Sequence, residues 1–268
     1  MIPLNFGSFW VGAPLSYLRY LTFKTLRHFH PHSRIQLFTS KKFRKDIVSG
    51  NAEQEYANPQ CIAKDYMPRL KELGVEIVPV PIPPNYFPFQ QADYYRWWFL
   101  KNPGGIYLDP DQIVLKSFTS LPLKNHEFLY SSYSVNSPYA PSGSFSPIGV
   151  LGSALNSRIA STIFSFAPKY YSESCYDSMG VLMMADMIKK LDMSKAFNAP
   201  SHYFYPAPIC DYMKGVYDGS MELSKDTYSV HWYGGCAPSF EFNKNYTEEF
   251  AKQSNDTISK WLRKNRMI

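Results

Sequence analysis

The sequence has 268 residues, of which 45% are hydrophobic and 19% charged, a balance that argues against disorder and suits one large α/β domain or two small ones. The net charge is +6 without any block of five or six like charges, so no nucleic-acid-binding tail is expected. No apolar run approaches the ~18–20 residues that a membrane span needs.

The four cysteines, Cys61, Cys175, Cys210 and Cys236, are scattered without a CxxC spacing. They fit neither a zinc site nor a dense disulfide scaffold, and buried free thiols are expected. The N-terminus, Met1–Tyr20, lacks a basic segment followed by an unbroken apolar core, so it does not resemble a signal peptide. A cytoplasmic protein is therefore expected.

The first half of the chain alternates between strand and helix patterns. Strands are predicted over 2–11, 35–39, 75–80 and 105–108, and helices over 15–29, 41–48, 65–73 and 91–101, with a polar loop over 51–59. This alternation predicts a mostly parallel central sheet flanked by helices, with ligands bound outside the carboxyl ends of the strands. His28, His30 and His32 lie around Pro31 at a helix end, where a solvated loop is expected rather than a set of metal ligands.

The second half of the chain continues with shorter elements. Strands are predicted over 112–115, 127–132 and 147–153, a long loop over 131–146, and helices over 156–171, 176–191 and 245–264. The last helix ends in a basic segment and has an apolar face of Ile258, Trp261 and Leu262. That face either packs on the body of the protein or rests on an anionic membrane surface.

The segment Ala92–Phe118 carries the chemistry. Asp109 and Asp111 follow a short apolar strand, and residues two apart in an extended chain point the same way, so both carboxylates can converge on one cation. Pro110 between them stiffens the link. Mg²⁺ and Mn²⁺ favour carboxylate oxygens and often bind through one or two carboxylates plus substrate phosphates. The pair therefore indicates metal-assisted handling of a diphosphate, although such a pair alone also occurs in ordinary polar loops.

The sequence upstream of this pair makes the pattern more specific. Asp93 and Arg96 lie three apart on one face of the predicted helix 91–101. The run Asp93-x-x-Arg96, followed by Gly104-Gly105-Ile106-Tyr107-Leu108-Asp109-x-Asp111, resembles the signature of DXD-type sugar transferases. These retaining glycosyltransferases include initiating yeast-type mannosyltransferases, α-1,4-galactosyltransferases and glucosylating clostridial toxins. The resemblance implies a GT-A-like α/β fold with a C-terminal helix.

The same resemblance implies a division of the chain. A single glycosyltransferase domain over 1–268 is expected, with residues 1–118 forming the donor-binding half and residues 119–268 the acceptor half and C-terminal helices. The run Phe9-Trp10-Val11-Gly12 resembles the end of the family's first strand, which meets the nucleotide base, so these four residues become donor-site candidates. Trp10 fits equally well as a core residue. Gly104, Gly105 and Tyr107 are counted with the donor site.

The resemblance also implies roles for the polar residues. Asp111 is expected to bind the metal directly, and Asp109 to bind it through water or to hold ribose and sugar hydroxyls. Asp93 is expected to accept hydrogen bonds from the transferred sugar, and Arg96 to donate to sugar or phosphate. The run 228–235 resembles the family's last strand, which ends in a histidine, so His231 is a candidate metal or phosphate partner. A hydrogen-bonded core histidine is the alternative.

The function that follows is a metal-dependent, retaining transfer of a hexose from a nucleotide sugar to a glycan, a lipid-linked sugar or a protein. The expected cofactor is Mn²⁺ or Mg²⁺, and the resemblance favours a UDP-sugar over a GDP-sugar. A nucleotide-sugar hydrolase and a non-catalytic sugar-binding module are the alternatives. The expected partners are thus a nucleotide sugar and a carbohydrate acceptor, with peripheral membrane contact through the C-terminal helix as a further option.

Overall fold

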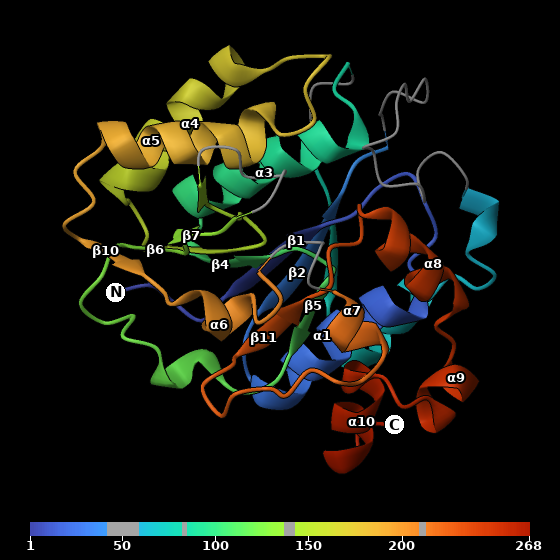
Figure 1. Ribbon diagram of the computed structural model, residues 1–268. Coiled ribbons are helices and arrows are strands. Elements are labelled where there is room, and N and C mark those ends of the chain that lie inside the picture. Colours follow the sequence, from blue (N-terminus) through green and yellow to red (C-terminus); the bar gives the residue numbers. More distant parts are fainter. Residues whose placement is uncertain (42–58, 82–84, 137–142, 209–212) are drawn as a thin grey trace.

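The computed structural model describes residues 1–41, 59–81, 85–136, 143–208 and 213–268. Its centre is a seven-stranded sheet in the order β10-β6-β9-β4-β1-β2-β3 (Figure 1). The pairs that β9 makes with β4 and β6 are antiparallel and the other pairs in this sheet are parallel. The strands are β1 (Phe6–Phe9), β2 (Ile35–Thr39), β3 (Glu76–Pro79), β4 (Gly105–Leu108), β6 (Phe128–Tyr130), β9 (Val150–Ser153) and β10 (Ala196–Asn198). The predicted mostly parallel central sheet is confirmed.

Helices cover both faces of the sheet (Figure 1). One face carries α3 (Pro88–Lys101), α4 (Arg158–Tyr170) and α5 (Met183–Lys190). The other face carries α1 (Tyr17–Phe29) and the C-terminal helices. The latter are α6 (Ser201–Phe204), α7 (Lys214–Tyr217), α8 (Ala237–Asn245), α9 (Glu248–Gln253) and α10 (Thr257–Lys264).

Two hydrophobic cores arise because strand side chains alternate between faces. In β4, Ile106 and Leu108 point into the core beneath α1, whereas Tyr107 points into the core beneath α3 and α4. In β1, Phe6 lies in the core beneath α1 and Phe9 lies in the core beneath α3 and α4. The end of β4 therefore lies between two packed layers, and residues that follow it can meet side chains from either layer.

A two-stranded antiparallel ribbon brings the end of the chain back to this point. β5 (Gln112–Val114) pairs with β11 (Ser229–His231), so that His231 lies opposite Gln112. A separate small hairpin consists of β7 (Tyr133–Ser134) and β8 (Ser144–Phe145), within the long predicted loop. Since strands from before and after residue 118 share the central sheet, the two expected halves of the chain are joined through it.

Several elements differ from the sequence-based predictions. The predicted helix 65–73 is a 3₁₀ helix, Met67–Leu73, that begins around a proline and ends at Gly74 with φ 65°. The predicted final helix 245–264 is broken, because α9 ends at Gln253 and the Asp256 side chain caps α10 by accepting a hydrogen bond from Ser259 N at 2.8 Å. α8 and β10 were not predicted. The predicted helix 41–48 and most of the loop 51–59 lie outside the described residues.

The prediction that all cysteines are buried free thiols was wrong. Cys236 is disulfide-bonded, and Cys61 and Cys175 are free but only half-buried. Disulfide bonds persist mainly in oxidising compartments, so this bond counts against the expected cytoplasmic location, which stays a prediction. In the part of the chain that the structure describes, no helix has both the length and the apolar character that crossing a bilayer requires.

His30 is a core residue and not part of a solvated loop. Its side chain is buried, its ring centroid lies 4.6 Å from that of Phe6, and its Nε2 accepts a hydrogen bond from Phe118 N at 3.1 Å. Burial lowers the pKa of His30 from 6.5 to about 4. The neighbouring His28 and His32 are exposed, so the three histidines do not form a ligand set.

The apolar face of the last helix packs on the body of the protein. Ile258 and Leu262 of α10 are buried, and the half-buried ring of Trp261 lies 6.1 Å from that of Phe29 in α1. Of the two readings of this helix, the structure favours packing. It gives no support to membrane contact through the apolar face.

Candidate functional site

The candidate site is built at the carboxyl end of β4, where the chain turns sharply into β5. Asp109 N donates to Gly149 O at 2.8 Å, and Thr22 of α1 donates from Oγ1 to Pro110 O at 3.0 Å. The backbone of Asp111 is tied to β11, because its carbonyl accepts from Trp232 N at 3.0 Å. These bonds fix the Asp-Pro-Asp turn against three different parts of the chain.

α3 contributes the other two residues of the predicted motif. Arg96 is 3% exposed and lies in a pair of salt bridges, with Asp93 on its own helix and, at 2.5 Å, with Asp109 after β4. Its guanidinium also lies 4.9 Å from the ring centroid of Tyr107. A fork-shaped cation thus holds two carboxylates, that of the buried Asp93 and that of the half-buried Asp109, in a fixed relation.

His231 joins Asp109 and Asp111 in a three-residue cluster. One ligand atom from each lies within 4.8 Å of the others, and His231 Nε2 lies 2.9 Å from Asp111 Oδ1. The other oxygen of Asp111, Oδ2, accepts a hydrogen bond from Gly234 N at 2.8 Å. Two carboxylates and an imidazole form a ligand set that suits Mn²⁺ and other divalent metals.

The space beside this cluster is kept open by a glycine. A Cβ placed on Gly149 would lie 3.1 Å from Gln112 Nε2, 3.2 Å from His231 Nε2 and 3.3 Å from Asp109 Oδ2. Gln112 is anchored by Ser229, whose Oγ donates to Gln112 Oε1 at 2.7 Å, whereas Gln112 Nε2 is buried without a hydrogen-bond partner. A buried donor with no partner is rare and indicates a ligand at this point. These residues therefore fit a divalent cation with an anionic ligand beside it.

The three aspartates differ in their electrostatic surroundings. Burial, helped by the charge of Asp109, raises the pKa of Asp93 to about 7 in spite of Arg96. Burial also raises the pKa of Asp109 against the effect of Arg96, and the nearby Asp111 adds to the rise. For Asp111, burial is outweighed by His231, Arg19 and the Gly234 N–H, so its pKa falls to about 2. Asp111 is thus held ionised and ready to bind a cation.

The structure brings Asp93, Arg96, Asp109, Asp111 and His231 into one site. Their roles in catalysis stay predictions. Arg96 was expected to donate to sugar or phosphate. In the structure its two terminal nitrogens donate instead to Asp93 and Asp109.

The residues at the end of the first strand lie mainly in the core. The side chains of Phe9, Trp10 and Val11 are at most 4% exposed. Trp10 donates from Nε1 to Ala13 O at 2.9 Å and lies 4.0 Å from the Arg19 guanidinium. Of the two readings of Trp10, the structure favours the core residue. Gly12 has φ 86°, a conformation that favours glycine, at the turn after β1.

Gly104 and Gly105 serve backbone packing at the start of β4, the end away from the aspartates. A Cβ on Gly104 would meet Leu155 N at 2.9 Å, and one on Gly105 would meet the Asn5 carbonyl oxygen. Both glycines have positive φ. Tyr107 is fully buried under Arg96, so its contribution to the site is through that residue.

Sequence reasoning missed Arg19, Gln112 and Gly149. Arg19 is fully buried and lies between the rings of Trp10 and Trp232, at 4.0 and 5.0 Å. A cation on the apolar face of a predicted amphipathic helix was a usable signal for Arg19, and a glutamine inside a predicted strand beside the aspartates was one for Gln112. No local signal distinguishes Gly149 from other loop glycines.

A short helical segment, Ser178–Leu182, closes the site over Asp93. A Cβ on Gly180 would lie 2.8 Å from Asp93 Oδ2, and Trp97 of α3 donates from Nε1 to Met179 O at 2.8 Å. The structure places this segment against the carboxylate predicted to bind the transferred sugar.

Comparison with known proteins agrees with this geometry. Residues 19–129 match the family described as glycosyltransferase sugar-binding region containing DXD motif, a segment that includes Asp93, Arg96, Asp109 and Asp111. The resemblance to DXD-containing glycosyltransferases is therefore confirmed. A search of curated proteins found no match.

Solved structures of glycosyltransferases are similar to this chain over 70% or more of its length. The PaToxG glycosyltransferase is 18% identical with a TM-score of 0.50, and the match covers 70% of this chain and 69% of that one. GlyE of Streptococcus pneumoniae TIGR4 is 17% identical with a TM-score of 0.46, over 85% of this chain and 55% of GlyE. The galactosyltransferase LgtC is 15% identical with a TM-score of 0.47, over 92% of this chain and 99% of LgtC. The chain has a GT-A-like fold, and family match and fold together support a sugar-transferring enzyme.

Proposed function

We propose that the protein is a metal-dependent, retaining hexosyltransferase that uses a nucleotide sugar, with a UDP-sugar preferred to a GDP-sugar. The observation that carries this proposal is the gathering of Asp93, Arg96, Asp109, Asp111 and His231 at the end of β4. The acceptor is a carbohydrate. Residues 1–118 bind the donor, and residues 119–268 contribute the acceptor side and His231.

The cation site supplies the electrostatics of the reaction. Asp109, Asp111 and His231 would hold Mn²⁺ or Mg²⁺, and the charge of such a cation would offset the negative charge on the departing nucleoside diphosphate. Gln112 Nε2 donates a hydrogen bond to a phosphate oxygen of the donor beside this cluster. Gly149 leaves the room for that oxygen.

The α3 side of the site holds the transferred hexose. Asp93 contacts sugar hydroxyls, and with a pKa of about 7 its carboxyl group can both accept and donate hydrogen bonds near neutral pH. Arg96 positions Asp93 and Asp109 relative to each other through its two salt bridges. Water is kept from these residues by the segment over Asp93.

The decisive experiment is a panel of UDP- and GDP-sugars with and without Mn²⁺, in which release of nucleoside diphosphate is followed. We expect metal-dependent turnover of one donor and a loss of at least about 100-fold in Asp111→Asn, because a charge in the electrostatic site is removed. The exposed Asp226→Asn is the matched control and should keep full activity. Absence of both turnover and metal-dependent donor binding would contradict the proposal.

Two alternatives are separated by two further measurements, release of free hexose and binding of free sugar. A nucleotide-sugar hydrolase would release free hexose at an undiminished rate when acceptor glycans are added. A sugar-binding module would bind free sugar without nucleotide or metal. The complete set of Asp93, Arg96, Asp109 and Asp111 argues against a non-catalytic module.

A further inference from the structure

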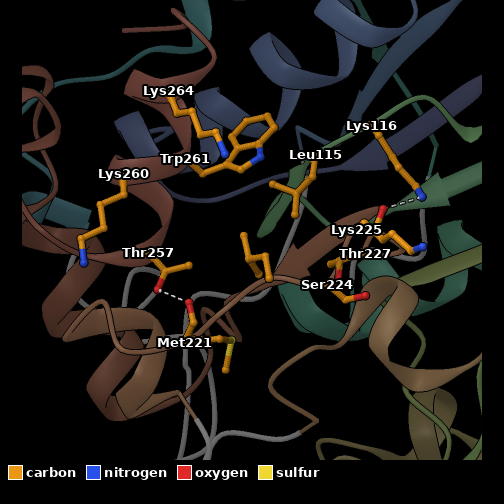
Figure 2. A pocket seen from close by; sticks show the side chains of 11 residues that line it. Leu115, Lys116, Met221, Ser224, Lys225, Thr227, Thr257, Lys260, Trp261 and Lys264 are labelled. Atoms are coloured by element: carbon orange, nitrogen blue, oxygen red, sulfur yellow. Dashed lines mark hydrogen bonds between the residues drawn. The ribbon is translucent and has the colours of Figure 1, made fainter.

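A cavity lies apart from the acidic cluster, between α10, the end of β5 and the segment 221–227 (Figure 2). Its volume is about 440 Å³, which falls within the range of roughly 300–1,000 Å³ that is typical of small-molecule sites. The ribbon of β5 and β11 separates it from the candidate active site. Gln112 and His231 pair at one end of this ribbon, and Leu115 N donates to Tyr228 O at 2.8 Å at the other. Three residues of strand correspond to about 10 Å.

The charge lining this cavity is entirely positive. Four of its lining residues are lysines and none is an aspartate or glutamate. Lys260 and Lys264 project from α10 on one side, and Lys116 and Lys225 lie on the other side (Figure 2). The two pairs lie at opposite ends of the cavity, so an anion bound at one end would interact with the ammonium groups of that end.

Two of these four ammonium groups contact neutral groups of the protein. Lys116 Nζ donates to Lys225 O at 3.0 Å and Lys260 Nζ donates to Gly219 O at 3.1 Å, both neutral carbonyls. Among the described residues, no salt bridge involves any of the four. The pKa of the exposed Asp218 is lowered mainly by hydrogen bonds with Ser220 and more weakly by Lys214 and Lys260, and this carboxylate does not line the cavity.

The rest of the lining is largely apolar. Leu115, Met221, Leu223 and Trp261 contribute side chains between the two pairs of lysines. A hydrated inorganic ion gains nothing from such a surface, whereas a ligand with a short hydrocarbon part does. The lining therefore calls for an anion that is also amphiphilic.

The cavity is held open by contacts around α10. Thr257 Oγ1 donates to Gly215 O at 3.2 Å and to Met221 O at 3.3 Å, which ties the segment after α7 to the start of α10. Gly219 has φ 76°, and a Cβ there would overlap Asn255 O and approach Lys260 Nζ to 2.8 Å. A backbone held so closely requires little rearrangement when a ligand binds.

We propose that this cavity binds a small phosphate ester with a short apolar part. The phosphate group lies at the α10 end of the cavity beside Lys260 and Lys264, and the apolar part contacts Leu115, Leu223 and Trp261. Both a soluble phosphate ester and the headgroup region of an anionic phospholipid have this chemistry. The inference is independent of the proposed sugar transfer, because none of these residues belongs to the acidic cluster.

The test is calorimetric titration with n-hexyl phosphate, inorganic phosphate and n-hexanol at fixed ionic strength. Wild type should bind hexyl phosphate at least about tenfold more tightly than inorganic phosphate, since the hydrocarbon chain is buried. The variant Lys260→Gln/Lys264→Gln should lose at least about tenfold in affinity, because two charge-assisted contacts are removed. The control Lys71→Gln/Lys189→Gln removes the same charge from exposed lysines elsewhere and should bind as wild type does.

Two results would overturn the proposal: hexyl phosphate binding no better than inorganic phosphate, or equal affinity of both double variants. Equal affinity of the two double variants would show that the phosphate compound does not bind in this cavity. Sedimentation with phosphatidylcholine vesicles that contain phosphatidic acid then identifies the source. Lysine-dependent co-sedimentation indicates a lipid, and hexyl phosphate binding without co-sedimentation indicates a soluble ester.

Discussion

Arg96 shows how a single residue can be identified from sequence while its contacts are not. Its spacing from Asp93 and from Asp109 placed it in the site. The sequence predicted donation to sugar or phosphate, whereas the structure pairs its terminal nitrogens with the two aspartates. The reason is burial. A guanidinium that is 3% exposed must be paired with charges where it lies, and these two carboxylates are within its reach.

Gly149 provides the sharpest test at the residue scale. Gly149→Ala places a methyl group 3.1–3.3 Å from Gln112 Nε2, His231 Nε2 and Asp109 Oδ2, where a ligand atom is expected. We expect Mn²⁺ affinity and donor affinity each to fall by about tenfold or more, as is typical when the surroundings of metal ligands are disturbed. Isothermal titration with Mn²⁺, followed by titration with the donor, measures both.

Gly215→Ala is the matched control for this substitution. Its Cβ would meet no atom closer than 3.4 Å, an ordinary contact, and it lies in α7 away from the acidic cluster. Both variants should unfold cooperatively. Unchanged Mn²⁺ and donor affinities in a folded Gly149→Ala protein would show that the space beside Gln112 is not used.

Among the elements, those with a strong local pattern were predicted well. α1, α3 and β4 begin and end within a few residues of their predicted bounds, since each has a clear apolar period and a distinct end. Ser16, for example, caps α1 by accepting a hydrogen bond from Arg19 N at 3.2 Å. The errors lie in short elements, such as β10 and α8, whose formation depends on neighbours distant in sequence.

The capping of α10 yields a prediction at the element scale. Asp256 is 1% exposed and its Oδ1 accepts a hydrogen bond from Ser259 N. Asp256→Ala should lower the free energy of unfolding by about 1 kcal/mol, the usual contribution of a helix cap. Asp256→Asn should retain most of it. Urea unfolding measures the difference, with the exposed Asp226→Ala as control. Equal stabilities of Asp256→Ala and the control would show that this helix does not depend on its cap.

At the scale of the whole molecule, the buried His30 links stability to pH. The unfolded histidine takes up a proton below pH 6.5, whereas the folded one does so only near its lowered pKa of about 4. The unfolded state therefore binds more protons between these values, and stability falls as the pH is lowered from about 6.5 to about 4. His30→Gln, which keeps an acceptor near Phe118 N, should remove this part of the pH dependence.

Urea unfolding at several pH values between 4.5 and 7.5 tests this prediction. Wild type should lose stability relative to His30→Gln as the pH falls. His32→Gln changes an exposed histidine and should follow wild type. If the difference between wild type and His30→Gln is constant over this range, His30 is not kept neutral by the fold.

The sequence by itself determined the α/β class, the mostly parallel sheet and the acidic residues of the site. The fold class depends on local periods of apolar residues. The site depends on the spacing of Asp93, Arg96, Asp109 and Asp111, because spacing within a helix or a strand determines which side chains share a face. His231 was proposed only through resemblance, because its partner Asp111 is 120 residues away. Contacts over such distances leave no local pattern.

Only the tertiary structure decided what surrounds these residues. It placed Gln112 and Gly149 beside the carboxylates, buried Arg19 between two tryptophans, and set four lysines, two of them from α10, around one cavity. Each of these arrangements joins segments that are distant along the chain, and burial then decides which charges must be paired and which are left for a ligand. The spacing of residues within a helix or strand determines which way their side chains point. The packing of helices and strands determines which other residues those side chains meet.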